Sequence, residues 1–330
     1  MMKAIVLVSG GLDSYIVVRL LQAQGIEPVA VHFRTPFYKQ DKLKMMEDAL
    51  GNMSRNLGVK LILESLGERY FQAMQNPRYG YGKNFNPCID CKIFMFQRAK
   101  ELMGEQGAGF VVSGEVLGQR PMSQNRESMK LIEKESGLEG ILVRLLSAKL
   151  FEATIAEQKG WLKSEALLGI CGRSRKIQIT LAQSLGIKKY PWPAGGCLLT
   201  EASFCHRLKD MRSHCRNFLD NFELLTVGRH FRVSPKFKFI VGRNENENSQ
   251  LASFIQEEDI WIEPADISGP SGLGRGTCSD RDKEISAAII ARYTCPGQEA
   301  EVLYRKIPET SSQKFKIRAL EENQLAKLRI

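Results

Sequence analysis

Apolar and polar positions alternate along the first half of the chain in a pattern that predicts strands separated by helices. Short runs rich in Val, Ile and Phe predict buried strands at residues 4–8, 28–33, 60–64, 109–114 and 141–144. Between them, apolar residues spaced three and four apart predict helices at residues 15–21, 41–57 and 88–103. Because strands alternate with helices, we expect an α/β fold with a doubly wound, Rossmann-like parallel sheet.

The last third of the chain has a different pattern. Residues 224–232 and 236–241 alternate in polarity on either side of Ser234 and Pro235, which predicts two adjacent strands. A predicted helix at 245–254, a short strand at 261–263 and a Gly-rich stretch at 268–276 follow. We therefore expect three parts, namely an α/β domain at 1–200, a basic helical linker at 201–220 and a smaller α+β domain at 221–330.

Charge is unevenly distributed between these parts. The net charge is +10, and residues 1–200 hold 27 Lys and Arg against 18 Asp and Glu, whereas residues 201–330 hold 20 against 19. Residues 173–216 contain nine basic residues and only two acidic ones. Such a basic surface is typical of a protein that binds a polyanion such as RNA. The basic residues that we expect to contact RNA are Arg173, Arg175, Lys176, Arg207, Arg229 and Arg232.

Composition narrows the class of protein further. The chain is 43% hydrophobic and 25% charged, as in globular proteins that do not enter membranes. No apolar run reaches membrane-spanning length, and the first apolar run looks like a core strand rather than a signal peptide. We therefore expect a cytoplasmic protein with no membrane partner.

The turn after the first strand carries the strongest motif. It reads Ser9-Gly10-Gly11-Leu12-Asp13-Ser14 and leads directly into a helical run. A strand, a Gly turn and a helix N-terminus place backbone N–H groups around an anion, and glycine lets the backbone approach closely. Ser9 and Ser14 add hydroxyl groups, and Asp13 adds a carboxylate that suits a metal ion. The Gly-Lys-Ser/Thr ending of a Walker loop is missing.

Ligands of open α/β sheets bind at the carboxyl ends of the strands. Phe33 ends the second predicted strand, which makes it a candidate contact for an adenine base. Gly114, Gln119 and Arg120 follow the fourth predicted strand and are expected to line the same crevice. Arg120 would offset the charge of phosphate groups there.

Three of the eight cysteines occur in patterns that suggest chemistry. Cys88 and Cys91 lie at i and i+3, on one face of a predicted helix, and Cys197 follows a Pro- and Gly-rich loop. Such a set can ligate a metal or a cluster, or carry a reactive sulfur. Three cysteines leave one iron of a [4Fe–4S] cluster open, whereas structural zinc needs a fourth ligand, for which Cys171 or Cys205 is available.

The motif at residues 9–14 resembles the PP-loop of the ATP pyrophosphatase superfamily. Together with Cys88, Cys91 and Cys197 it resembles the tRNA thiouridine synthetases of that superfamily, over roughly residues 1–215. The resemblance implies a HUP-type Rossmann-like fold and ATP cleavage to AMP and pyrophosphate. It assigns ATP and Mg²⁺ to Ser9, Gly10, Gly11, Asp13 and Ser14, and a [4Fe–4S] cluster to the three cysteines. In the tail, Val241-Gly242-Arg243-Asn244 before an acidic helix resembles the NFACT-R domain, an RNA-binding module.

The expected function is that of an ATP-dependent tRNA sulfurtransferase. By resemblance, a uridine carbonyl oxygen is adenylated and sulfur then displaces AMP, with Asp13, Cys88 and Cys197 taking part. The expected partners are a tRNA and a sulfur donor, either sulfide or a persulfide carrier, and a homodimer is left open. Two alternatives remain, namely a PP-loop enzyme that makes an amide or thioamide of a small molecule, and a nucleotide-responsive RNA-binding factor.

Overall fold

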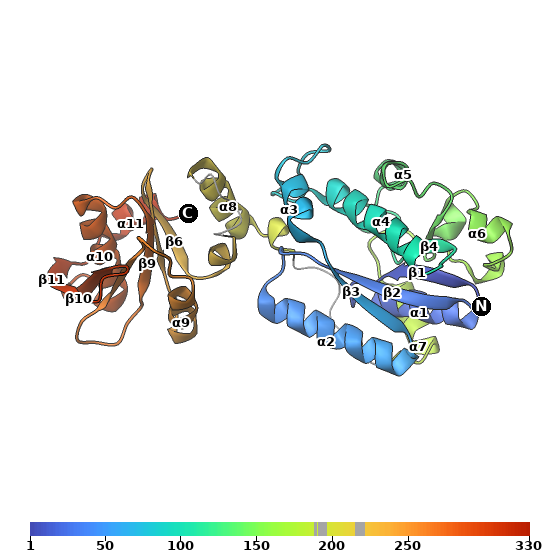
Figure 1. Cartoon of the computed structure of the whole chain (residues 1–330), viewed down its shortest axis with the longest axis horizontal. Helices are drawn as coiled ribbons and strands as arrows, with labels where there is room; N and C mark the ends of the chain where they lie inside the picture. The colour runs from blue at the N-terminus through green and yellow to red at the C-terminus, as the bar shows by residue number, and fades with distance from the viewer. Residues whose placement is uncertain (188–189, 191–196, 215–221) are drawn as a thin grey trace. The chain divides into compact units, whose positions relative to one another are not determined.

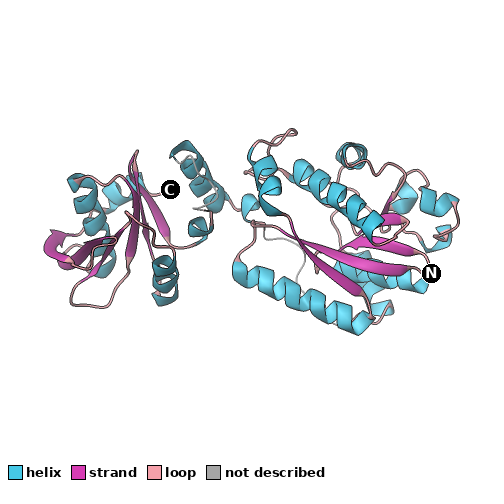
Figure 2. Ribbon diagram, in the orientation of Figure 1, coloured by secondary structure: helices cyan, strands magenta, loops and turns pink. Residues whose placement is uncertain are grey.

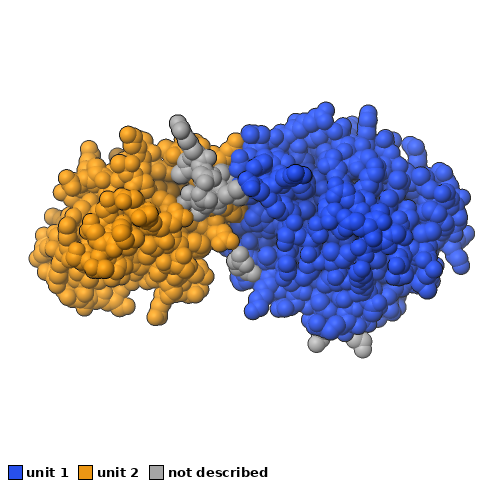
Figure 3. Space-filling view, viewed as in Figure 1, with its two compact units in different colours: residues 1–200 blue, residues 201–330 orange. Residues whose placement is uncertain are grey.

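The computed structural model describes residues 1–187, 190, 197–214 and 222–330. The chain divides into two compact units, residues 1–200 and residues 201–330 (Figure 3). The Pro- and Gly-rich loop at 191–196, three of the basic residues counted above (Lys188, Lys189 and Arg216) and part of the predicted linker lie outside the described residues.

The first unit contains the predicted parallel sheet. Its five strands run in the order β3-β2-β1-β4-β5, and every neighbouring pair is parallel. The strands are β1 (Lys3–Leu7), β2 (Glu27–Arg34), β3 (Lys60–Ser65), β4 (Phe110–Ser113) and β5 (Leu142–Arg144). All five predicted strands are therefore confirmed, with ends shifted by no more than a residue or so. The chain moves outward from β1 to β3 and then returns to β4 beside β1, so the topological switch point lies between β1 and β4.

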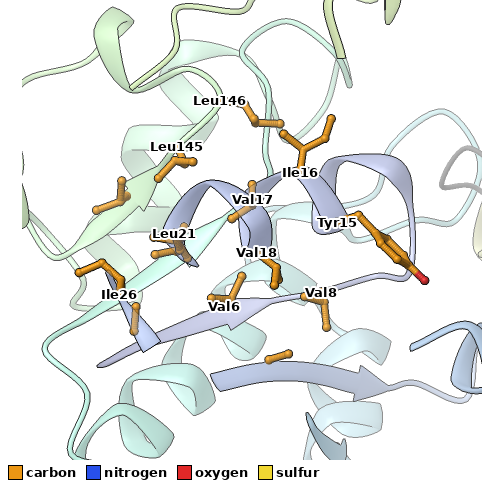
Figure 4. Close-up of a cluster of buried hydrophobic side chains, with 14 of the residues drawn as sticks. Val6, Val8, Tyr15, Ile16, Val17, Val18, Leu21, Ile26, Leu145 and Leu146 are labelled. Atoms are coloured by element: carbon orange, nitrogen blue, oxygen red, sulfur yellow. The ribbon is translucent and has the colours of Figure 1, made fainter. Parts of the chain in front are cut away.

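Helices cover both faces of this sheet, as Figures 1 and 2 show. They are α1 (Leu12–Ala23), α2 (Gln40–Leu57), α3 (Gly67–Gln75), α4 (Cys88–Glu105), α5 (Arg126–Glu135), α6 (Ile155–Gln158) and α7 (Lys176–Ser184). Short 3₁₀ turns occupy Ala148–Leu150, Ser164–Ala166 and Leu198–Thr200. Helix α1 is apolar on most sides because Ile16, Val17 and Val18 are all fully buried between the sheet and its neighbours (Figure 4).

The second unit is an antiparallel α+β domain. Its six strands run in the order β11-β10-β8-β9-β7-β6, and every neighbouring pair is antiparallel. The strands are β6 (Arg229–Ser234), β7 (Phe237–Val241), β8 (Ile260–Pro264), β9 (Gly272–Gly276), β10 (Glu299–Lys306) and β11 (Gln313–Arg318). The helices are α8 (Ala202–His214), α9 (Glu245–Ser253), α10 (Asp280–Thr294) and α11 (Glu322–Leu328).

One prediction for this unit needs correction. The strand expected from residue 224 begins only at Arg229, because Glu223–Thr226 form a 3₁₀ turn whose Leu224 and Leu225 are buried. The Gly-rich stretch contains a strand, β9, in the middle of the sheet. A Cβ atom on Gly272 would lie 2.2 Å from Cζ of Phe239, so glycine is present because an aromatic ring lies over the strand.

The described helices include none that is both long enough and apolar enough to cross a membrane.

Candidate active site

The loop between β1 and α1 has the geometry of an anion-binding turn. Gly10 adopts a left-handed backbone conformation, with φ of +74°, that other residues rarely adopt. The backbone N–H of Ser9 donates to the Ser14 hydroxyl at 2.9 Å, which fixes the loop against the first turn of α1. Gly11 occupies the N-cap position and no side chain caps the helix there. The first N–H groups of α1 are therefore available to phosphate oxygens.

The loop that follows β4 meets this turn at the switch point. A Cβ atom on Gly114 would lie 3.2 Å from Cβ of Asp13 and 3.3 Å from its backbone carbonyl group. Glycine at this position thus allows the two loops to touch. Residues far apart in the sequence, Asp13 and Gly114, thus lie side by side at the carboxyl edge of the sheet, as the order of the strands requires.

Asp13 is a half-buried acid at this edge of the sheet. Its Oδ1 atom is shielded from solvent and has no hydrogen-bond partner among the described residues. Burial raises the pKa of the Asp13 carboxyl, and the nearby Arg175, Gln119 and Arg120 side chains act in the opposite direction. A buried carboxylate oxygen with no partner suits a hard cation, so the residue fits a Mg²⁺ ion bound together with ATP phosphates.

Arg175 lies closer to the nucleotide loop than the sequence suggested. The backbones of Cys171 and Leu117 form an isolated parallel β-bridge. The backbone N–H of Gly172 donates to the Leu117 carbonyl at 2.7 Å. These contacts bring the start of α7 next to the loop after β4. Arg175, which we predicted to contact RNA, is thereby close enough to act on Asp13. Its neighbours Arg173 and Lys176 are exposed.

The three predicted cysteines all act electrostatically on one tyrosine. Burial raises the pKa of Tyr38 to about 12, with Cys197, Cys91 and Cys88 acting in the same direction and Arg120 against them. Cys88 is the first residue of α4, and its Sγ accepts from Asn86 Nδ2 at 3.2 Å. Cys88, Cys91, Cys197 and Arg120 are therefore all within electrostatic range of Tyr38.

Cys91 is held in a closed environment. Its Sγ lies 3.0 Å from the Tyr70 hydroxyl. Burial raises the pKa of the Cys91 thiol to about 11, and the Tyr70 hydrogen bond only partly offsets this. A thiol with this pKa is protonated at neutral pH, so Cys91 needs a bound metal or another cation to become a thiolate.

Neither Tyr38 nor Tyr70 is among the residues predicted from the sequence. Tyr38 follows the carboxyl end of β2, so its position after a predicted strand is a signal that was available. Tyr70 lies on α3 and is fully buried, and the sequence carries no sign that distinguishes it from an ordinary core residue.

An ion-pair network connects the cysteine helix to the crevice. Lys92 Nζ contacts Glu115 Oε1, while Glu115 Oε2 accepts from Ser113 Oγ at 3.3 Å and from Arg144 Nε at 3.4 Å. Burial, with Arg120 and Arg144 nearby, lowers the pKa of Lys92 to about 7. The contact with the Glu115 carboxylate opposes that shift. Glu115 thus ties the residue after Cys91 to the end of β4.

The cysteines suit a cluster in kind. Three thiols near one another are the usual donors for a [4Fe–4S] cluster, and Arg120 and Lys92 supply positive charge that favours thiolates. Over 1–187, 190, 197–214 and 222–330, however, no three Cys, His, Asp or Glu side chains form a group ready to hold a metal ion. The type of side chain therefore agrees with a cluster, whereas the described positions of these side chains do not form a ready ligand site.

The remaining predicted residues have the following places. Phe33 is buried near the end of β2, so its contact with adenine stays a prediction. Arg232 forms a bidentate ion pair with Asp210, at 2.9 and 2.6 Å. Arg229 donates to the Gly242 carbonyl at 3.1 Å and lies over the Tyr293 ring. Arg229 and Arg232 are thus engaged in contacts inside the second unit.

Comparison with known proteins agrees with the two units. Residues 1–150 match the family described as thiamine biosynthesis protein (ThiI), and residues 228–329 match the family described as NFACT protein RNA binding domain. A probable tRNA sulfurtransferase of Thermococcus kodakarensis is 29% identical over 136 residues, which are 41% of this chain and 35% of that protein. The chain spans about a third of the length of the curated relatives it matches.

Two solved structures resemble parts of this chain at low identity. A 4-thiouridine synthetase–RNA complex with bound ATP is 22% identical with a TM-score of 0.36, over 56% of this chain and 50% of that one. The U34-tRNA thiolase NcsA from Methanococcus maripaludis, with its [4Fe–4S] cluster, is 14% identical with a TM-score of 0.32, over 68% and 72%. At these TM-scores neither likeness bears on function. The family matches show that residues 1–150 resemble the ThiI family and that residues 228–329 resemble the NFACT-type RNA-binding domain.

Proposed function

We propose that the chain is an ATP-dependent tRNA sulfurtransferase that replaces a uridine carbonyl oxygen with sulfur. The observation that carries the proposal is the position of Arg120, whose charge acts both on Asp13 in the nucleotide loop and on Cys91 beside the predicted sulfur site. One side chain therefore lies near both an ATP-binding loop and a set of cysteines, as an enzyme that activates an oxygen and then delivers sulfur requires.

In the first step the uridine oxygen attacks the α-phosphorus of ATP and pyrophosphate leaves. The Ser9–Ser14 loop and the uncapped start of α1 would hold the phosphates, and Asp13 would hold Mg²⁺. Gly114 and Gln119 would line the crevice, and Arg120 and Arg175 would stabilise the negative charge that develops on the leaving group.

In the second step a sulfur nucleophile adds to the activated carbon and AMP leaves. AMP is a far better leaving group than an oxide ion, which is the reason for spending ATP. Cys88, Cys91 and Cys197 would hold a [4Fe–4S] cluster, and such a cluster, when bound, presents sulfur to the activated uridine. If the carrier is instead a persulfide, Cys88 or Cys197 is the better candidate, because burial keeps the Cys91 thiol protonated.

The tRNA would contact the basic side chains of both units. Arg173 and Lys176 are exposed near the crevice, whereas Arg207 lies in the second unit. The NFACT-type domain supports an RNA substrate over a small molecule. Whether the product is 2-thiouridine or 4-thiouridine depends on which carbonyl reaches the α-phosphorus.

The test separates the two steps. After anaerobic purification, pyrophosphate release and thiolated nucleosides are measured with ATP and bulk tRNA, together with iron and acid-labile sulfide. Cys88→Ala, Cys91→Ala and Cys197→Ala should each keep pyrophosphate release and lose thiolation, and exposed Cys171→Ala is the matched control. Fully active, iron-free protein would overturn the cluster and leave the persulfide route. If the rate of pyrophosphate release is the same with and without tRNA, the proposal that the chain is a tRNA sulfurtransferase is wrong.

A further inference from the structure

Basic side chains from three elements gather around a buried histidine in the second unit. His230 on β6 is 1% exposed, and its Nε2 donates to the Val227 carbonyl at 2.8 Å. Lys238 on β7, Arg207 on α8 and Arg243 after β7 all act on His230 and hold its pKa well below the usual value, in addition to the larger effect of burial. We call these four residues the His230 cluster.

Arg207 is the unusual member of the His230 cluster. Its Nε is shielded from solvent without a hydrogen-bond partner, and the side chain forms no ion pair with a described residue. Arg243 is close enough to repel it, while Glu201 and Glu247 attract it only at longer range. Shielding the Nε atom of this half-buried guanidinium from water without a hydrogen-bond partner costs free energy.

The acidic groups around the cluster are already engaged. Asp210 on α8 pairs with Arg232 at 2.6 Å and lies 3.5 Å from both Lys238 Nζ and His214 Nδ1. Glu247 pairs with Arg243 at 3.2 Å. Arg207, Arg232, Lys238 and Arg243 therefore face two close carboxylates, Asp210 and Glu247. Positive charge is therefore in excess, and Arg207 is the member of the set that forms no ion pair with a described residue.

We propose that Arg207 and Arg243 bind a phosphate group, and that this group belongs to the backbone of the RNA substrate. The shielded Nε of Arg207 and the excess of positive charge favour an oxyanion, and Arg243 is close enough to Arg207 for both guanidinium groups to act on it. Helix α8 precedes residues 228–329, so Arg207 adds to the NFACT-type domain a contact from outside it. This inference rests on the proposed function for the identity of the RNA.

The experiment measures tRNA affinity over a range of salt concentrations for the full chain, for Arg207→Gln, for Arg207→Lys and for Arg281→Gln. Arg281 is an exposed arginine on α10 and makes the matched control. Arg207→Gln should weaken binding by about tenfold and lower the slope of log affinity against log salt by about 1. Arg207→Lys should restore part of the affinity, and Arg281→Gln should change little.

Thermal unfolding tells a binding role from a structural one. Arg207→Gln removes a half-buried charge that forms no ion pair with a described residue, so its Tm should stay level or rise while its affinity falls. A lower Tm with unchanged affinity would overturn the proposal. Titration with inorganic phosphate separates the two sources of the anion. If phosphate binds through Arg207 and tRNA affinity does not depend on Arg207, the site takes free phosphate and the RNA assignment is wrong.

These outcomes are independent of the sulfurtransferase test. Loss of tRNA affinity in Arg207→Gln without any thiolation by the wild type would leave the phosphate contact standing and remove the proposed function. Thiolation by the wild type together with an unchanged salt slope in Arg207→Gln would support the proposed function and remove the phosphate contact.

Discussion

Asp13 in the first unit and Arg207 in the second each have a shielded atom without a hydrogen-bond partner among the described residues, and the two charges have opposite sign. The shielded atoms are Oδ1 of Asp13 and Nε of Arg207. Buried polar atoms are nearly always satisfied, so an exception indicates a missing ligand, and its charge indicates the ligand's sign. The shielded oxygen of Asp13 suits a cation, and the shielded nitrogen of Arg207 suits an anion.

The surroundings of the two groups differ in an instructive way. Asp13 lies where two loops meet at the carboxyl edge of a parallel sheet, a place that the fold itself assigns to ligands. Arg207 lies on a helix packed against a β-hairpin, a place with no such general meaning. Topology and chemistry agree in the first case, whereas chemistry stands alone in the second. The following experiments test each side of this comparison.

The largest effect is expected from Asp13→Asn. The variant keeps the shape of the side chain and removes the charge that would hold Mg²⁺, so tRNA-dependent pyrophosphate release should fall by about 100-fold or more. Burial already disfavours the charged form of Asp13, so Tm should not fall. Asp41→Asn, on another acid in the first turn of a helix, is the matched control. Normal pyrophosphate release in Asp13→Asn would remove Asp13 from the ATP site.

A smaller effect is expected from Gly114→Ala. The added Cβ would lie 3.2–3.3 Å from Asp13 atoms, which forces the two loops apart by a few tenths of an ångström. We expect KM for ATP to rise by about tenfold, because binding geometry is sensitive to small displacements of positioning groups. Gly51→Ala on α2 meets only the end of the Arg55 side chain, at 3.6 Å, and serves as the control. An unchanged KM would mean that ATP does not use the contact between the two loops.

The sequence predicted the parts of the first unit that depend on local pattern. Five apolar runs became five parallel strands, and the loop at Ser9–Ser14 lies between a strand and a helix as expected. Parallel strands are buried on both faces, so their sequences are continuous apolar runs that are easy to recognise. The meeting of Asp13 with Gly114 also followed, because the order of strands in such folds is restricted.

Other features depend on contacts that no local pattern records. Gly272 and Gly274 lie in a central strand because Phe239 and Phe237 pack over them, and a Gly-rich segment alone resembles a loop. The run of basic residues predicted that Arg175 contacts RNA. The isolated β-bridge between Cys171 and Leu117 instead brings Arg175 close to Asp13 in the Ser9–Ser14 loop. Tyr70 beside Cys91 likewise comes from packing between α3 and α4.

The smallest effect concerns His230 and sharpens the comparison from the side of the second unit. Its pKa in the folded state is well below 6.5, so as the pH falls the unfolded chain takes up a proton that the folded domain does not. Stability of this unit should therefore decrease from about pH 7 to about pH 5, by at most about 1.4 kcal/mol per pH unit. The lowered pKa of Asp210 has no part in this window, because its contribution is lost only below 3.8. Urea unfolding followed by Trp261 fluorescence, with Trp161 and Trp192 changed to Phe, measures the slope of stability against pH. His230→Gln should flatten this slope.

A bound phosphate would offset the surrounding positive charge and raise the pKa of His230, so RNA should weaken the pH dependence in the wild type but not in Arg207→Gln. An equal slope with and without RNA would separate His230 from the phosphate site.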